Sequence, residues 1–161
     1  MFDFFKKQQD PMDVVKRIGS QLTELMNIVN FTQNLPQGSY EIKVYLETVV
    51  FVTSVVLFKV STFQKTDFKK FSDEFSNAFL TVAAESQAEY DYLWESLSKK
   101  RPAYDNLLDM YSQAPSVGTA YLLLRNFFEN CTNEQIDSIR AMTASVEFIK
   151  IVKTIAKNTY E

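Results

Sequence analysis

The sequence contains no histidine, and this absence removes a large part of enzyme chemistry. Histidine is the most usual general base, and it belongs to every catalytic triad that uses imidazole. It is also a ligand in the di-iron sites of ferritin-like helical bundles. With one cysteine and no histidine, the usual tetrahedral zinc site cannot form. We therefore expect no metal, no cofactor and no enzyme of these classes.

Motifs for phosphate recognition and charge for nucleic-acid binding are also lacking. The chain has no Gly-x-Gly-x-x-Gly stretch and no Walker-type Gly-Lys-Ser/Thr stretch, so nucleotide phosphates have no recognisable cradle. Its formal net charge is −3, whereas nucleic-acid binders usually present a basic footprint. Nucleic acid is therefore not an expected partner.

The single cysteine, Cys131, cannot form an internal disulfide. No apolar segment of signal-peptide length follows Lys6 and Lys7 near the N-terminus. Together these observations predict a reducing, cytoplasmic location. A thiol at a helix N-terminus would have a lowered pKa and could be redox-active. Because no resolving cysteine or histidine accompanies it, we expect Cys131 to be an inert, partly buried thiol.

Glycine and proline are too scarce for a fold that depends on many tight turns. The 161 residues include three glycines and four prolines, which disfavours an all-β protein and favours long helices. The chain length suits a single domain covering residues 1–161, with 1–9 as a partly ordered N-terminal stub. The predicted fold is all-α: a single-domain helical bundle of five to seven helices.

The most apolar stretch, residues 40–63, is predicted to be the central helix of the bundle. Its Val, Phe, Tyr and Thr content suits a strand, but no turn residues divide it into a hairpin. Wound as a helix, it is apolar on two faces, which predicts neighbours on both. A membrane span is the alternative, but Glu47 and Lys59 leave only Thr48–Phe58 free of charge.

Helical periodicity and start signals predict the other helices. Asp10, Pro11 and Asp13 are typical of a helix N-terminus. The following helix extends to about Phe31. A further helix is expected through Tyr121–Phe128, ending near Cys131, and the last helix is expected to begin at Thr132.

The middle of the chain leaves one alternative open. Residues 67–98 form either one helix or two with a joint near Glu85 and Ser86, and Pro102 is expected to open a separate short helix. The basic triplet at 99–101 would then complement the C-terminus of the preceding helix.

Acidic residues gather around the possible joint. Glu85 and Glu89 lie one helical turn apart and could hold a divalent cation with water, but such a group is usually a solvated face. The solvated face is the interpretation we favour.

Three groups of residues are candidates for an interaction surface. The first is an aromatic group beside two N-terminal lysines, the second is an alternating aromatic pair, and the third is a lysine row on the last helix. For each group the simpler explanation is ordinary packing or solvation within a bundle. The residues are Phe2, Phe4 and Phe5; Tyr92 and Trp94; and Lys150, Lys153 and Lys157.

These observations predict a non-enzymatic intracellular interaction protein: an adaptor, chaperone-like or regulatory bundle that binds another protein. The two-faced central helix also suggests a homodimer. An alternative is a bundle that encloses an apolar small molecule or acyl chain between aromatic-rich helices. A weaker alternative is a peripheral membrane protein. The proposed cavity would be lined by Phe51, Phe58, Phe71, Phe75 and Phe79.

Overall fold

A computed structural model describes residues 10–19, 39–63 and 68–132, together with 145, 149, 150, 152–155, 157 and 159. All regular structure in these ranges is helical, so the predicted all-α fold is confirmed. The described helices are α1 (Pro11–Gly19), α3 (Ser39–Phe63), α4 (Phe68–Ala83), α5 (Gln87–Gln113) and α6 (Val117–Thr132). Helical residues between 145 and 157 follow them near the C-terminus.

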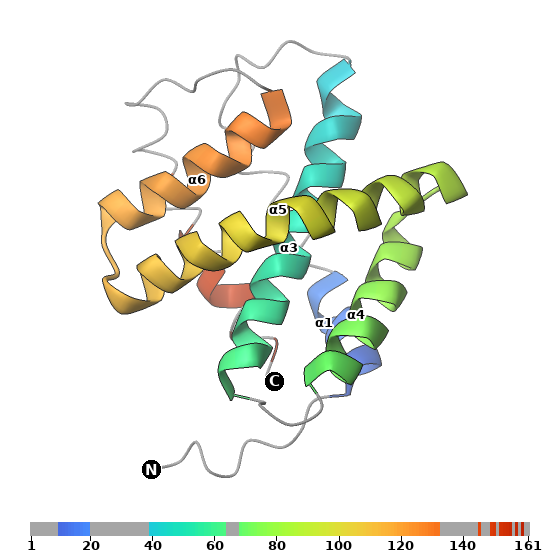
Figure 1. Cartoon of the computed structure of the whole chain (residues 1–161), viewed down its shortest axis with the longest axis horizontal. Coiled ribbons are helices and arrows are strands. Elements are labelled where there is room, and N and C mark those ends of the chain that lie inside the picture. The colour runs from blue at the N-terminus through green and yellow to red at the C-terminus, as the bar shows by residue number, and fades with distance from the viewer. Residues whose placement is uncertain are drawn as a thin grey trace.

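Helix α3 is the centre of the bundle, as its sequence predicts. It packs against α4, α5 and α6, and its most extensive contact is with α5. Figure 1 shows α5 crossing α3, with α6 on the left of α3 and α4 on its right. From Val49 to Leu57 every side chain is buried. The two apolar faces of the sequence therefore both meet neighbouring helices.

The buried hydroxyl groups of α3 are satisfied within the helix itself. The hydroxyls of Thr48, Thr53 and Ser54 donate to the carbonyl oxygens four residues earlier, at 2.7, 2.8 and 2.9 Å. A buried hydroxyl without a partner would be costly, and these bonds remove that cost. Such local bonding allows a helix rich in Thr and Ser to lie fully inside the protein.

The segment Lys43–Thr62 is long and apolar enough to cross a membrane. However, 78% of its most apolar window is buried inside the protein. Neighbouring helices therefore occupy the surface that lipid would contact. A segment buried to this extent is a core helix of the bundle.

Helix α1 begins where the sequence predicts. The Asp10 carboxylate accepts the backbone N–H of Met12 at 2.8 Å, as an N-cap residue does. Val14, Val15 and Ile18 are buried, and α1 packs against α4. The Arg17 guanidinium donates to the carbonyl oxygen of Thr159 at 2.9 Å, which connects α1 to the C-terminal residues.

The segment 67–98 contains two helices, and their joint lies at the predicted place. Helix α4 ends at Ala83, and Ser86 caps α5 by accepting the backbone N–H of Glu89 at 3.2 Å. In return, the Glu89 carboxylate accepts the backbone N–H of Glu85 at 2.9 Å. This arrangement resembles a capping box, in which two helix-end donors are satisfied reciprocally. The Glu89 carboxylate thus has a structural partner.

The prediction that Pro102 opens a separate helix is wrong, because α5 continues through Pro102 to Gln113. A proline inside a helix cannot donate to the carbonyl four residues earlier, here that of Ser98. Ser98 and Pro102 are both exposed, so this carbonyl lies on the solvent side of α5. Water can then replace the missing donor, which makes the interior proline tolerable.

Aromatic rings fill the interior in two separate groups. Phe51 meets Tyr104 and Phe127 edge to face, with ring centroids 5.2 and 5.5 Å apart. On α4, Phe75 stacks between Phe71 and Phe79, at 5.7 and 5.4 Å. Three of the five rings that were expected to line a cavity, Phe71, Phe75 and Phe79, thus pack on one another, and a fourth, Phe51, packs on Tyr104 and Phe127.

Candidate functional site

An open hollow of about 360 Å³ lies beside the turn between α5 and α6. This turn is at one end of the molecule in Figure 1. The hollow is bounded by the end of α5, the turn, the start of α6 and residues near the C-terminus. Its described lining residues are Tyr111, Pro115, Ser116, Val117, Ala120, Ser145, Ile149, Lys150 and Lys153.

Local hydrogen bonds fix the shape of this turn. The Ser116 hydroxyl accepts the backbone N–H of Thr119, and the Thr119 hydroxyl accepts that of Ser116, both at 3.1 Å. At the other helix end, the backbone N–H of Ala114 donates to the carbonyl of Met110 at 3.0 Å. With the helix ends satisfied, the turn is a well-defined wall of the hollow.

Apolar side chains are exposed on this end of the molecule. Val117 is 51% exposed at the rim of the hollow, and Met110, in the last turn of α5, is 46% exposed. Single exposed apolar residues are common on protein surfaces. Here, however, Val117 belongs to a concave site with a mainly apolar lining, which is the usual character of a binding site.

The charge of the hollow differs in sign from that of the whole chain. The formal net charge of the protein is −3, whereas the charged residues among the described lining are Lys150 and Lys153. No carboxylate belongs to that described lining. The N-terminus of α6 at Val117 adds a partial positive charge. The charged side chains in the described part of the hollow are therefore all positive.

The predicted lysine row is exposed, but its members are placed differently. Lys150, Lys153 and Lys157 are all exposed, while Val152 and Ile155 are buried in the core. Lys150 and Lys153 line the hollow, and Lys157 does not belong to its lining. The amphipathic pattern thus predicted the exposed face, and the tertiary structure brings two of its three lysines to the hollow.

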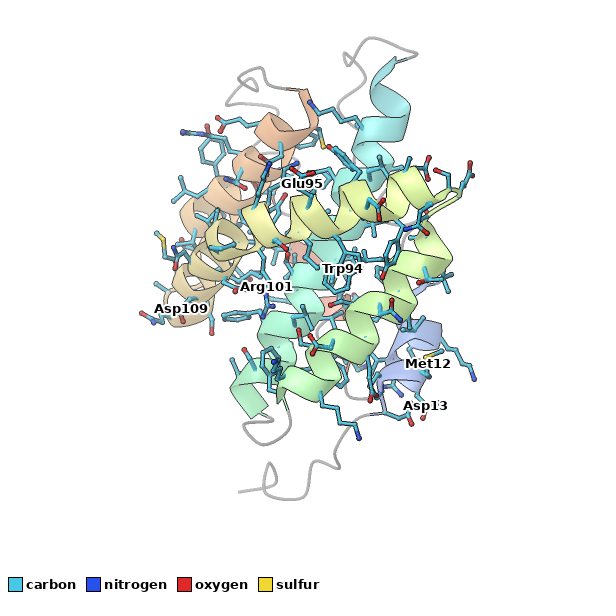
Figure 2. The ribbon with its side chains drawn as sticks, turned by 45° about the vertical axis from the view of Figure 1, so that its right-hand side comes forward. Met12, Asp13, Trp94, Glu95, Arg101 and Asp109 are labelled. Atoms are coloured by element: carbon cyan, nitrogen blue, oxygen red, sulfur yellow. The ribbon has the colours of Figure 1, made fainter. Side chains whose placement is uncertain are left out.

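The aromatic pair on α5 lies away from the hollow. Tyr92 is 40% exposed, whereas Trp94 is partly buried, packs on the core and meets the Tyr90 ring edge to face at 6.2 Å. In Figure 2, Trp94 lies beneath α5 on the side of α4, and Glu95 lies on the opposite side of α5. Of this pair, Tyr92 is therefore the residue more accessible to a partner.

The remaining sequence candidates, Phe2, Phe4 and Phe5, lie outside the described residues. Whether they join an interaction surface stays a prediction.

A second notable feature is a polar cluster buried where α3, α5 and α6 meet. The Glu47 carboxylate accepts a hydrogen bond from the Lys100 ammonium at 2.6 Å and a short hydrogen bond from the Tyr104 hydroxyl. The Asn130 side-chain amide donates to the same hydroxyl at 3.3 Å. Glu47 is 2% exposed and Tyr104 is fully buried. Each buried polar group in this cluster therefore has a partner, as a stable interior requires.

This cluster contradicts the role expected for the basic triplet at 99–101. Lys100 does not complement a helix C-terminus, because α5 continues for another thirteen residues to Gln113. Instead its ammonium reaches inward to Glu47 on α3. Lys100 and Tyr104 are four residues apart and thus share one face of α5. That spacing indicates that Lys100 and Tyr104 can share a partner. Nothing in the sequence identifies this partner as Glu47, which lies fifty-three positions before Lys100.

Cys131, in the last turn of α6, is buried and lies within the electrostatic influence of this cluster. The thiol is fully buried, and burial, reinforced by the negative charge of Glu47, raises its pKa well above the ordinary 9.0. Lys100 and Lys43 oppose this rise but do not cancel it. A buried, protonated thiol at the C-terminal end of a helix has the environment of an inert cysteine. The structure thus buries Cys131 more completely than the sequence suggested.

Alkaline pH should therefore destabilise the protein through the Cys131 thiol and the Tyr104 hydroxyl. Burial, with the Glu47 charge, also raises the pKa of Tyr104 above 10.0. Above about pH 9 the unfolded chain releases the Cys131 proton, and above about pH 10 that of Tyr104, while the folded protein keeps both. The free energy of unfolding should fall by about 1.4 kcal/mol per pH unit for each group.

Urea unfolding at several pH values from 8 to 11 measures this effect. Cys131→Ala should remove the fall that begins near pH 9, and Tyr104→Phe the part that begins near pH 10. Identical slopes in the wild-type protein and both variants would contradict the assignment.

No family model, curated protein or solved structure matches this chain. The described residues contain no group of three or more Asp, Glu or Cys that could hold a metal ion. The fold and the site therefore define the protein by its own features: an all-α bundle around a buried helix, with a lysine-bordered apolar hollow at one end.

Proposed function

We propose that this protein is a non-enzymatic, cytoplasmic interaction protein that binds another protein through the end of the bundle at the α5–α6 turn. The observation that carries the proposal is the hollow of about 360 Å³ with Val117 half-exposed at its rim. When a partner covers an apolar concave site that is open to water, apolar surface is buried and the free energy of the system falls.

The surrounding structure supports this use of the hollow. A reciprocal pair of hydrogen bonds fixes the turn, and the buried residues Val152 and Ile155 anchor the segment that carries the two lysines. A preformed surface loses little conformational entropy when it binds, which favours affinity. The buried Glu47 cluster connects α3 to α5 and α6, the two helices that border the hollow.

Val117→Asp should strongly weaken partner binding through this surface. The carboxylate would place a charge in the apolar contact, where a partner would have to desolvate it. A stoichiometric partner recovered by affinity purification with the wild-type protein should bind the variant at least tenfold more weakly, as measured by calorimetry.

Val82→Asp is the matched control for this experiment. Val82 lies on α4, is 74% exposed and does not line the hollow. The same change in charge and shape at this position should leave the affinity within about twofold. Equal binding by wild-type protein and Val117→Asp would exclude this surface as the partner site.

A second candidate function is the binding of an apolar small molecule that carries an acidic group. Ligand sites in proteins usually have volumes of about 300–1,000 Å³, and the hollow lies at the lower end of that range. Native mass spectrometry of the purified protein tests this function, because a copurifying acyl-chain acid would favour it over a protein partner.

A further inference from the structure

We infer that the hollow recognises a segment of the partner protein in which a large apolar side chain stands beside carboxylates. This inference rests on the proposed function and specifies the chemistry of its partner. The apolar side chain would fill the hollow against Val117 and Ile149, and the carboxylates would lie near Lys153.

Charge complementarity is the first argument for this partner. In a chain of net charge −3, the described lining of the hollow carries two lysines and no carboxylate. Lys153, an exposed lysine of this lining, would attract and orientate an acidic segment, whereas a basic or neutral segment would gain nothing from it. The partial positive charge at the N-terminus of α6 has the same sign and adds to this preference.

The openness of the site is the second argument, and it favours a protein segment over an enclosed small molecule. Small-molecule sites usually bury at least 70% of the ligand surface. Here Pro115, Ser116, Val117 and both lysines are exposed, so the walls of the hollow are themselves part of the protein surface. A partner that covers these walls buries more apolar area than a ligand confined to the hollow.

Two short peptides that differ in charge test the inference. The acidic probe is acetyl-ELFEE-amide, and its basic twin is acetyl-KLFKK-amide. Each is titrated into the full chain at low ionic strength while NMR follows the backbone amides of Val117, Gly118 and Ala120. The acidic peptide should shift these amides and bind at least tenfold more tightly than its twin. This preference should shrink at 0.5 M salt, which screens exposed charges.

Reversing a lysine of the hollow should weaken the acidic peptide specifically. Lys153→Glu is expected to lower its affinity about tenfold, since an attraction becomes a repulsion. Lys153→Gln should have an intermediate effect. The matched control is Lys70→Glu on α4, which changes the net charge equally at an exposed position outside the hollow. It should leave the affinity within twofold, and circular dichroism should show that all three variants are folded.

The possible failures separate this inference from the proposed function. Equal affinity for both peptides at the hollow would overturn the inference and leave protein binding there intact. Tenfold tighter binding of dodecanoate than of the acidic peptide would overturn it in favour of the small-molecule function. If neither peptide shifts the three amides, the inference is also wrong. The proposed function fails separately, if the purified partner binds Val117→Asp as well as it binds the wild-type protein.

Discussion

Phe51→Ala is expected to lower the free energy of unfolding by about 4 kcal/mol, one of the two largest effects we predict. The Phe51 ring is fully buried at the crossing of α3, α5 and α6. It meets the rings of Tyr104 and Phe127 edge to face, at 5.2 and 5.5 Å. Alanine would lose the transfer free energy of the ring and leave a cavity that three rigid helices cannot fully close.

Equilibrium urea unfolding followed by circular dichroism measures this loss. Phe51→Leu keeps most of the apolar volume and should cost about 1.5 kcal/mol. Tyr92→Ala, at a 40% exposed aromatic position on α5, should change the free energy by about 0.5 kcal/mol or less. A loss below about 1 kcal/mol for Phe51→Ala would mean that the three helices do not meet at this ring.

The second large effect is expected at the buried ion pair. Lys100→Met removes the ammonium that lies 2.6 Å from the Glu47 carboxylate, which is 2% exposed. The carboxylate would keep the Tyr104 hydroxyl as a partner but would have no opposite charge in direct contact among the described residues. Breaking one side of a buried pair leaves an uncompensated charge, so we expect a loss of about 3 kcal/mol in the free energy of unfolding.

An apolar replacement of the whole cluster distinguishes the cost of a broken pair from the contribution of the pair. In the triple variant Glu47→Met, Lys100→Met and Tyr104→Phe, no charge of the cluster remains. Asn130 still has a partner, because its side-chain amide also donates to Asn126 at 3.1 Å. Replacing a buried pair by apolar residues of similar volume is often neutral or stabilising.

The triple variant should therefore be at least 2 kcal/mol more stable than Lys100→Met alone. Urea unfolding of the wild-type protein and both variants side by side gives both differences. If the triple variant were less stable than Lys100→Met, the cluster would contribute net stability through its hydrogen bonds, and an uncompensated Glu47 charge would not be the main cost of losing Lys100.

The helix ends show which features of the fold local sequence patterns can predict. Asp10 was predicted to cap the first helix and does so through a 2.8 Å hydrogen bond. The joint near Glu85 and Ser86 was one of two alternatives, and the Ser86–Glu89 cap favours it. These features depend on residues within four positions of one another, so local sequence contains the necessary information. The prediction at Pro102 was wrong, because a helix can tolerate an interior proline where that face of the helix meets solvent, and the local sequence does not specify this face.

The sequence by itself determined the all-α class, the central helix at 40–63 and the exposed lysine face of the last helix. Each of these follows from composition or from a period of 3.6 residues, both of which are properties of a local stretch. Only the tertiary structure decided that Lys100 reaches Glu47 and that Lys150 and Lys153 border a hollow beside Val117. Such contacts join segments far apart in the chain, and they depend on how the helices cross, which periodicity alone does not specify.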